Sequence, residues 1–399
     1  MKILMAVVIV FCGWCTAVNP AFAQTWTQSS APNDFWDAVA SSADGTKLVA
    51  GNISGGIYTS TNSGTTWTSN NVPSDHWLSV ASSADGAKLA AVASDGQIFT
   101  STNAGTTWTS NNVPPYYWLS IASSADGNKL VAVAYSNLVY TSTDSGATWT
   151  SNSLPVNTQQ WLFVSSSADG AKLVVAGDLG LIYTSTNSGV TWTVPTNAPI
   201  APWQAVASSA DGSKLVLVGL TNLFYTSSDS GATWKSNSVP SVASWQSVAS
   251  SADGNNLVVV APGQNGLIYS STNSGATWIE TADTPDGFHC SIVSSADGNK
   301  LVLIPGGYYN GSTGTFVRDV IFTSYSTPSP QLNLVPADNN LLLSWLVPST
   351  NFVLQQNLDL TTTNWVTLTN APTLNLTNLQ DEVTLSPTNS SGFFRLITK

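Results

Sequence analysis

Residues 77–108 read WLSVASSADGAKLAAVASDGQIFTSTNAGTTW, and this stretch decides the fold. A Ser-Ala-Asp-Gly turn separates its first two β-rich runs, and a polar, Gly-containing turn that ends at Trp108 follows the third. The same order returns along the chain at intervals of 41 to 44 residues, as the Asp of the first turn shows: Asp44, Asp85, Asp126, Asp169, Asp211, Asp253 and Asp297. A period of about 42 residues with about four short strands is typical of a propeller blade. The sequence therefore predicts an all-β chain that forms a seven-bladed β-propeller.

The second turn, Ser-Thr-Asn/Asp-x-Gly-x-Thr-Trp, occurs only six times. Its polar position is held by Asn62, Asn103, Asp144, Asn187, Asp229 and Asn273. The seventh unit reaches Ser324 and then departs from the pattern, whereas a Thr-Trp-Thr segment stands alone at residues 25–27. We expect this leading segment to supply the outer strand of the last blade, which would close the ring without an open sheet edge.

The six copies resemble the Asp-box, or BNR, repeat of sialidases, sortilin-type receptors, xyloglucan-cleaving glycosidases and photosystem II stability/assembly factors. The resemblance covers residues 24–324 and implies a propeller in which the Asp-box is a structural turn opposite the ligand-binding face. It also implies that a sialidase would need three arginines, but Arg318 is the only arginine in this region. The same shortage argues against the basic patch that the assembly factors present.

Turn chemistry accounts for much of the charge in the repeats. Asn and Asp side chains accept hydrogen bonds from nearby backbone N–H groups, while the Gly adopts positive φ. Four of the six Asp-box positions are neutral Asn, whereas Ca²⁺ prefers carboxylates, so we expect no metal and no cofactor there. Six lysines follow the first turn by three residues, and we interpret them as solvated hairpin charges: Lys47, Lys88, Lys129, Lys172, Lys214 and Lys300.

The composition limits the classes of partner. Only 8% of the 399 residues are charged, and the net charge is -11 with a pI near 4.3. No basic stripe is available to neutralise phosphates, which excludes a nucleic-acid binder.

The first 23 residues have the layout of a secretory signal: Lys2, an apolar run over residues 3–15, and Ala21-Phe22-Ala23. We therefore expect cleavage after Ala23, secretion to the extracellular space or periplasm, and no transmembrane segment in the mature chain. Cys290 then has no internal disulfide partner.

The opposite face of the propeller carries the candidate chemistry. Asp34 and Asp75 precede the first strands of their blades by equivalent steps, and Asp286 lies one place earlier in the last blade. His76 and Asp95 fall in the same sector, because the last, first and second blades are neighbours. These three aspartates are weak candidates for a catalytic acid-base pair in glycoside hydrolysis, Asp with His for a metal site, and the plain alternative is that they cap their own loops.

Aromatic residues divide into a repeated and an unrepeated set. We expect the Trp that opens six of the units to pack between blades: Trp36, Trp77, Trp118, Trp161, Trp203 and Trp245. Unrepeated tyrosines are better ligand-binding candidates, and we assign Tyr116, Tyr117, Tyr308 and Tyr309 to a ligand site together with His76 and Asp95.

After a linker at residues 325–330, the period vanishes. Residues 331–399 contain short alternating runs typical of a small β-sandwich, and they resemble the C-terminal module of many secreted bacterial proteins. We expect a monomeric, non-enzymatic extracellular binding or scaffold protein for glycan or protein ligands. The alternative is a glycoside hydrolase of the xyloglucan-cleaving type.

Overall fold

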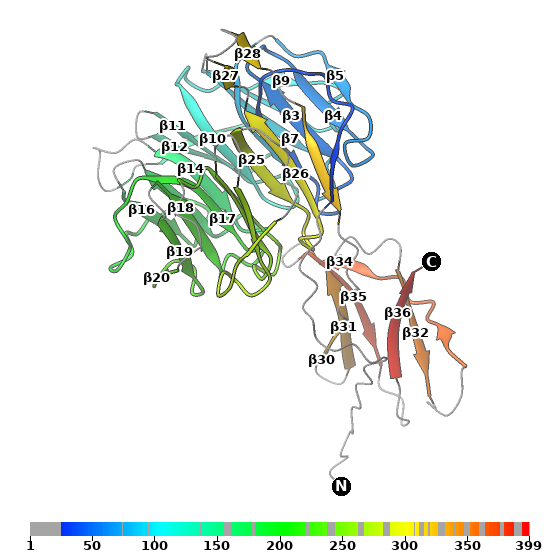
Figure 1. Cartoon of the computed structure of the whole chain (residues 1–399). Helices are drawn as coiled ribbons and strands as arrows, with labels where there is room; N and C mark the ends of the chain where they lie inside the picture. The colour runs from blue at the N-terminus through cyan, green and yellow to red at the C-terminus, as the bar shows by residue number, and fades with distance from the viewer. Residues whose placement is uncertain are drawn as a thin grey trace. The chain divides into compact units, whose positions relative to one another are not determined.

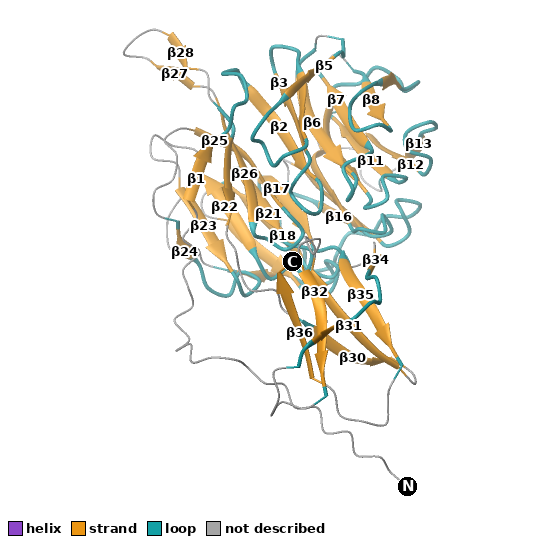
Figure 2. Cartoon of the chain, turned by 90° about the vertical axis from the view of Figure 1, so that its right-hand side faces the viewer, coloured by secondary structure: helices purple, strands orange, loops and turns teal. Residues whose placement is uncertain are grey.

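The computed structural model describes residues 25–398, with the exception of 74, 95, 136–137, 153, 155–160, 178–179, 221–222, 238–243, 262–266, 282–287, 307, 311–314, 318–319, 326–331, 338–339, 347–351, 359–363, 376–378 and 387–392. All regular structure in this part of the chain is β-strand (Figures 1 and 2). No helix there could cross a membrane. The described residues form two compact units, and each is described by itself.

The first unit contains seven sheets of three or four strands that follow one another along the chain, and we number them as blades 1 to 7. Blade 1 contains β2 (Trp36–Ser41), β3 (Leu48–Asn52), β4 (Ile57–Ser60) and β5 (Thr68–Asn70). Blade 2 contains β6 (Trp77–Ser82), β7 (Leu89–Ala93), β8 (Ile98–Ser101) and β9 (Thr109–Ser110). Blade 3 contains β10 (Trp118–Ser123), β11 (Leu130–Ala134), β12 (Leu138–Ser142) and β13 (Thr150–Asn152). Blade 4 contains β14 (Trp161–Ser166), β15 (Leu173–Gly177) and β16 (Ile182–Ser185). Blade 5 contains β17 (Trp203–Ser208), β18 (Leu215–Gly219), β19 (Leu223–Ser227) and β20 (Lys235–Ser236). Blade 6 contains β21 (Ser247–Ser250), β22 (Leu257–Ala261), β23 (Leu267–Ser271) and β24 (Ile279–Glu280). Blade 7 contains β25 (Phe288–Ser294), β26 (Lys300–Gly306), β29 (Phe322–Tyr325) and β1 (Thr25–Gln28).

The second strand of each blade is an apolar run because both of its faces are covered by neighbouring blades. In blades 1 to 6 all five residues of this strand are buried. The side chain of Trp161 lies outside the description. The other five opening tryptophans lie in the same interfaces, as predicted. Four of them are fully buried: Trp77, Trp118, Trp203 and Trp245.

The ring is closed by the N-terminal strand, which confirms the prediction. Strand β1 pairs with β29 in antiparallel register, Trp26 opposite Ser324, and so becomes the outer strand of blade 7. Figure 1 shows the yellow strands β25 and β26 beside the blue strands of blade 1, and β2 contacts both of them.

A second closure lies at the centre of the ring, in the Ser-Ala-Asp-Gly turns. The backbone N–H of each turn alanine donates to the carbonyl of the next turn alanine, at 2.7 to 2.8 Å. The donors run in order Ala43, Ala84, Ala125, Ala168, Ala210, Ala252 and Ala296, and Ala296 donates back to Ala43. Seven blades are thereby linked in one unbroken cycle.

The turn lysines are not the free hairpin charges that we expected. Lys47 Nζ donates to the Asp85 carbonyl oxygen of blade 2 at 2.6 Å, and Lys300 Nζ donates to the Asp44 carbonyl oxygen at 2.7 Å, which joins blade 7 to blade 1. The sequence interpretation was wrong because it assigned each lysine to its own turn, whereas a side chain of this length reaches the next blade. These lysines are links between blades.

The Asp-box turns have the predicted chemistry and one feature beyond it. In blade 1, Asn62 Oδ1 accepts the N–H of Thr66 at 2.8 Å, and Trp67 Nε1 donates to the Gly64 carbonyl oxygen at 3.0 Å. Gly64 has φ 83°, as expected, but Ser63 before it is also left-handed, with φ 57°. The equivalent residue is left-handed in all other copies: Ala104, Ser145, Ser188, Ser230 and Ser274.

Blade 4 departs from the four-strand pattern among the described residues. Its outer strand is reduced to a bridge between Thr184 and Thr193. Pro195 follows at the place where Asn111 of blade 2 donates its backbone N–H to the Ile98 carbonyl oxygen. Proline has no N–H to donate, so the pairing stops.

The second unit is a small β-sandwich, as predicted. One sheet has the order β30 (Asn333–Ala337), β31 (Asn340–Leu346), β35 (Gln380–Leu385), β34 (Thr373–Asn375), and the other has β33 (Val366–Thr367), β32 (Phe352–Asn357), β36 (Phe393–Thr398). Its core joins the two sheets through buried Leu343, Trp345 and Val383 on one side and Leu354 on the other.

Candidate functional site

We call the face that carries the Ser-Ala-Asp-Gly and Asp-box turns the turn face, and the opposite one the loop face. The loop face contains the segments that enter each first strand and the loops between second and third strands. A repeated backbone hydrogen bond pairs these two segments, from Ile53 N to the Phe35 carbonyl oxygen in blade 1 and from Tyr135 N to the Tyr117 carbonyl oxygen in blade 3. Each described blade with this bond therefore presents two side chains beside one another.

Asp34 is held by its own blade. Its Oδ1 accepts hydrogen bonds from the Phe35 backbone N–H at 2.8 Å and from Ser54 Oγ at 2.7 Å, and its Oδ2 accepts one from Asn52 Nδ2 at 2.8 Å. A carboxylate used in this way caps loops. The geometry therefore matches the plain alternative considered for this residue.

Asp75 makes a related arrangement in blade 2. Its Oδ1 accepts the backbone N–H of His76 at 2.6 Å and, at 3.5 Å, the hydroxyl of Ser94. Both donors belong to the same pair of loop-face segments, so this carboxylate also orients its own loops.

His76 instead reaches across to the neighbouring blade. Its Nε2 lies 3.0 Å from Oδ2 of Asp37, the second residue of the first strand of blade 1. Each side chain is 36% exposed, so the pair is accessible from the loop face. Asp37 is a site residue that the sequence reasoning left unassigned, because its contact with His76 crosses from blade 1 to blade 2 and a single repeat does not specify contacts between blades.

Two tyrosines form an exposed aromatic pair on blade 3. Tyr117 is 48% exposed and Tyr135 is 49% exposed, and their rings meet edge to face at a centroid distance of 6.3 Å. Tyr116 is directed differently, since its ring packs against Trp118 and Tyr140 in the core. The sequence reasoning did not select Tyr135, although the repeat places it directly after the second strand of its blade, where Ile53 stands in blade 1.

Aliphatic side chains extend the apolar character of the loop face. Ile53 of blade 1, Leu220 of blade 5 and Ile200 in the segment that enters blade 5 are all exposed. Monomeric proteins seldom expose large apolar side chains in groups unless the surface binds something. The loop face therefore combines apolar and aromatic side chains with one His–Asp pair.

Several predicted site residues cannot be placed. Asp95 and Asp286 lie outside the described residues. The backbones of Tyr308 and Tyr309 belong to β27 (Tyr308–Asn310), which pairs with β28 (Thr315–Val317) in a hairpin (Figure 2), but their side chains are outside the description. Within the described part of the chain, no three His, Cys, Asp or Glu side chains gather as metal ligands would.

The turn face carries the ring of carboxylates. Burial alone would raise the pKa of Asp85, but hydrogen bonds from Ser83 Oγ and Ala87 N, with the charge of Lys47, outweigh it and lower the pKa. The same balance lowers the pKa of four equivalents: Asp44, Asp126, Asp169 and Asp211. In blade 7 the burial of Asp297 prevails and raises its pKa. These groups are occupied in turns, so the turn carboxylates are structural.

Comparison with known proteins agrees with this architecture. The model of a family described as photosynthesis system II assembly factor YCF48, with the BNR repeat, matches residues 117–280. The propeller is of the BNR type. No curated protein sequence matches the chain.

Solved structures with a similar fold come from different functional classes. YCF48 bound to a D1 peptide is 12% identical with a TM-score of 0.59, covering 77% of this chain and 96% of that one. YCF48 from Cyanidioschyzon merolae is 14% identical with a TM-score of 0.59 and coverages of 75% and 98%. The GH74 xyloglucanase from Xanthomonas campestris is 14% identical with a TM-score of 0.57, covering 81% of this chain and 59% of that one. Identities this low establish the fold alone.

Proposed function

We propose that the propeller is a non-enzymatic protein-binding module that holds a peptide segment of its partner on the loop face over blades 1 to 3. The observation that carries the proposal is the exposed Tyr117–Tyr135 pair. Tyrosine supplies a large, rigid and amphipathic contact area at low entropic cost, which is why it is enriched in binding interfaces.

A peptide is favoured over a glycan as the ligand because aliphatic side chains are exposed on the same face as these tyrosines. Aliphatic Ile53 of blade 1 can contact an apolar side chain of a peptide, whereas glycan sites rely on aromatic stacking and polar groups. The structural likeness to YCF48 bound to a D1 peptide supports the same choice. The His76–Asp37 pair adds a polar anchor for a backbone or side-chain hydrogen bond.

No described feature favours hydrolysis. A glycosidase needs two carboxylates that face a groove, and both oxygens of Asp34 accept hydrogen bonds from its own blade. The GH74 likeness concerns the fold.

Selection from a random-peptide display library, run in parallel with a glycan array, tests the proposal. Selected peptides should lose at least about tenfold in affinity for the double variant Tyr117→Ala/Tyr135→Ala, because each aromatic anchor contributes more than about 1 kcal/mol. The matched control is Val190→Ala, an exposed apolar side chain of an Asp-box turn on the turn face, and it should bind as the unmodified protein does. Failure to select peptides, glycan binding instead, or peptides indifferent to the double variant would refute the proposal.

We also propose that this module acts outside the cytoplasm as a monomer. Lys2, the apolar run that follows it and the Ala21-Phe22-Ala23 triplet support export. N-terminal sequencing of the secreted protein should begin at Gln24, and light scattering should give the mass of one chain.

A further inference from the structure

A cavity of about 250 Å³ opens between blades 5 and 6 on the side of the turn face. The residues that line it include Val216 and Leu257, which belong to the core between these two blades, and the lysines Lys214 and Lys235. The corresponding crevice between blades 3 and 4 is lined by equivalent residues, among them Lys129 and Leu130, but holds only about 10 Å³. The repeat therefore builds this crevice more than once, and the crevice between blades 5 and 6 is much larger than the one between blades 3 and 4.

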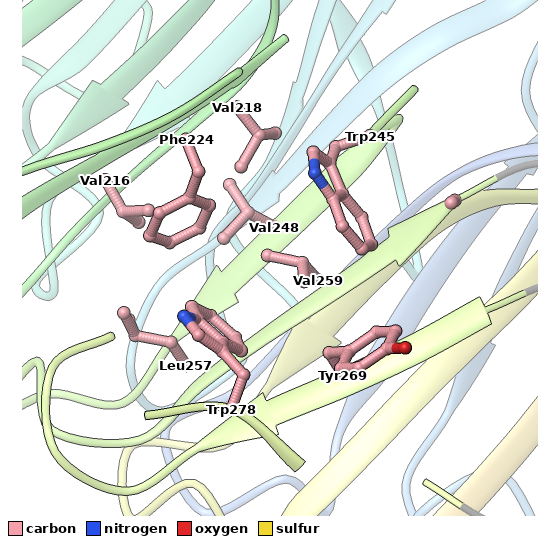
Figure 3. Packing of buried hydrophobic residues seen from close by; sticks show 10 residues of the cluster. Val216, Val218, Phe224, Trp245, Val248, Leu257, Val259, Tyr269 and Trp278 are labelled. Carbon is pink, nitrogen blue, oxygen red and sulfur yellow. The ribbon is translucent and has the colours of Figure 1, made fainter. Parts of the chain in front are cut away.

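The cause of the enlargement is a single bulky residue. Phe224 stands at the position that Ile57, Ile98, Val139, Ile182, Ile268 and Ile321 hold in the other blades. Its ring meets Trp278 of blade 6 edge to face at 4.8 Å, and Figure 3 shows the two rings next to each other, with Leu257 beside Trp278. Phe224 therefore acts as a wedge between blades 5 and 6.

A measure of the spacing agrees with the wedge. A Cβ built on the Asp-box glycine of blade 6, Gly275, would lie 3.4 Å from Thr226 Cγ2 of blade 5. The equivalent separation is 2.8 Å between Gly189 and Thr141 of blades 4 and 3. The threonine and the glycine are thus farther apart at the enlarged crevice.

The same crevice has gained a cation. Lys235 follows the Asp-box Trp at the position where Thr68, Thr109, Thr150 and Thr193 stand in earlier blades. Lys214 Nζ donates to Asn255 Oδ1 at 2.7 Å and to Ser274 Oγ at 3.2 Å, which leaves one of its three N–H groups for another acceptor. Among the described residues, neither ammonium is in ion-pair contact with a carboxylate. Two such cations beside one cavity are exceptional in a protein with a net charge of -11.

We propose that the crevice between blades 5 and 6 binds a small organic carboxylate with an apolar, ring-sized body. The carboxylate would lie against Lys214 and Lys235, and the apolar body would lie between Val216 and Leu257. The site is on the face opposite the peptide surface and does not depend on it.

Titration of the ¹⁵N-labelled full chain with benzoate, and with neutral benzamide of the same shape, tests the site. The backbone N–H signal of Gly254, which lines the cavity, should shift and saturate with benzoate at a Kd of about 1 mM, as a ligand of this size permits. Benzamide should bind about tenfold more weakly, because it lacks the charge-assisted contact.

Two variants borrow their residues from other blades. Lys235→Thr should weaken benzoate binding about threefold to fivefold, and Phe224→Ile should abolish it by letting the blades close. Thr150→Lys places the same cation beside the small crevice between blades 3 and 4, so the backbone N–H signal of Gly170, the equivalent of Gly254 in that crevice, should stay still. A Gly254 signal that benzoate does not move, equal binding of benzoate and benzamide, or undiminished binding by a folded Phe224→Ile protein would overturn the proposal.

Discussion

Removal of strand β1 tests how the ring is closed. Deletion of Thr25–Gln28 would leave β29 without its outer partner, because all four residues pair with Phe322–Tyr325. Trp26 would also leave the core formed by blades 6 and 7, where it packs against the buried cluster of Leu301, Leu303 and Ile268.

The size of the effect follows from opposing contributions. About four backbone hydrogen bonds at about 1 kcal/mol each, with about 3 kcal/mol for the partly buried indole, favour the closed ring. Release of four residues returns about 1 kcal/mol each in backbone entropy. The net loss in the free energy of unfolding is about 3 kcal/mol, which lowers the Tm by about 6 °C in a domain of this size.

Differential scanning calorimetry and urea unfolding, with β1 deleted and with the exposed Thr25→Ala as control, measure this loss. The control should unfold like the parent. The deletion should also raise the tendency to aggregate, since β29 becomes an open edge. A deletion variant that keeps the parental Tm within about 1 °C would show that β1 is an accessory and that the reasoning on closure is wrong.

Two further outcomes are expected. The lowered pKa values of Asp85 and Asp126 mean that their contribution to stability is complete above the unfolded-state pKa and is lost as the pH falls through the folded-state value. Urea midpoints should therefore fall as the pH drops below about 4, and less steeply in Asp126→Asn. Lys300→Met removes the hydrogen bond to the Asp44 carbonyl oxygen and should lower the free energy of unfolding by about 1 kcal/mol, as measured by urea unfolding. Lys129→Met loses the equivalent bond to the Asp169 carbonyl oxygen. An equal loss of stability in the two variants would show that the links between blades are equivalent.

The fold was predictable because two different turn motifs recur along the sequence with the same period. The Ser-Ala-Asp-Gly turn counts seven units and the Asp-box counts six, and Trp26 supplies the difference. Each repeat contains its own turns and strands, so local chemistry was sufficient to define a blade.

Relations between blades were harder to predict from local chemistry. The reach of Lys47 to the next turn, the contact of His76 with Asp37 and the wedge formed by Phe224 all depend on spacing across an interface. For the candidate site, Tyr117 is exposed as the prediction requires, whereas Asp34 caps its own loops. A pattern identifies residue types at a face, but it does not specify which partner each of them meets.

Because blade 7 lacks an Asp-box, the two outer strands of this blade are not joined by a turn as they are in the other blades. Tyr325 and Thr25 lie opposite one another at the ends of paired strands, where the other blades join the same two strands through that turn. A seventh Asp-box inserted between them would complete the circle covalently. New termini placed in any other Asp-box should then give a circularly permuted propeller with the same central cycle of alanine hydrogen bonds. The chain could therefore begin and end at any blade.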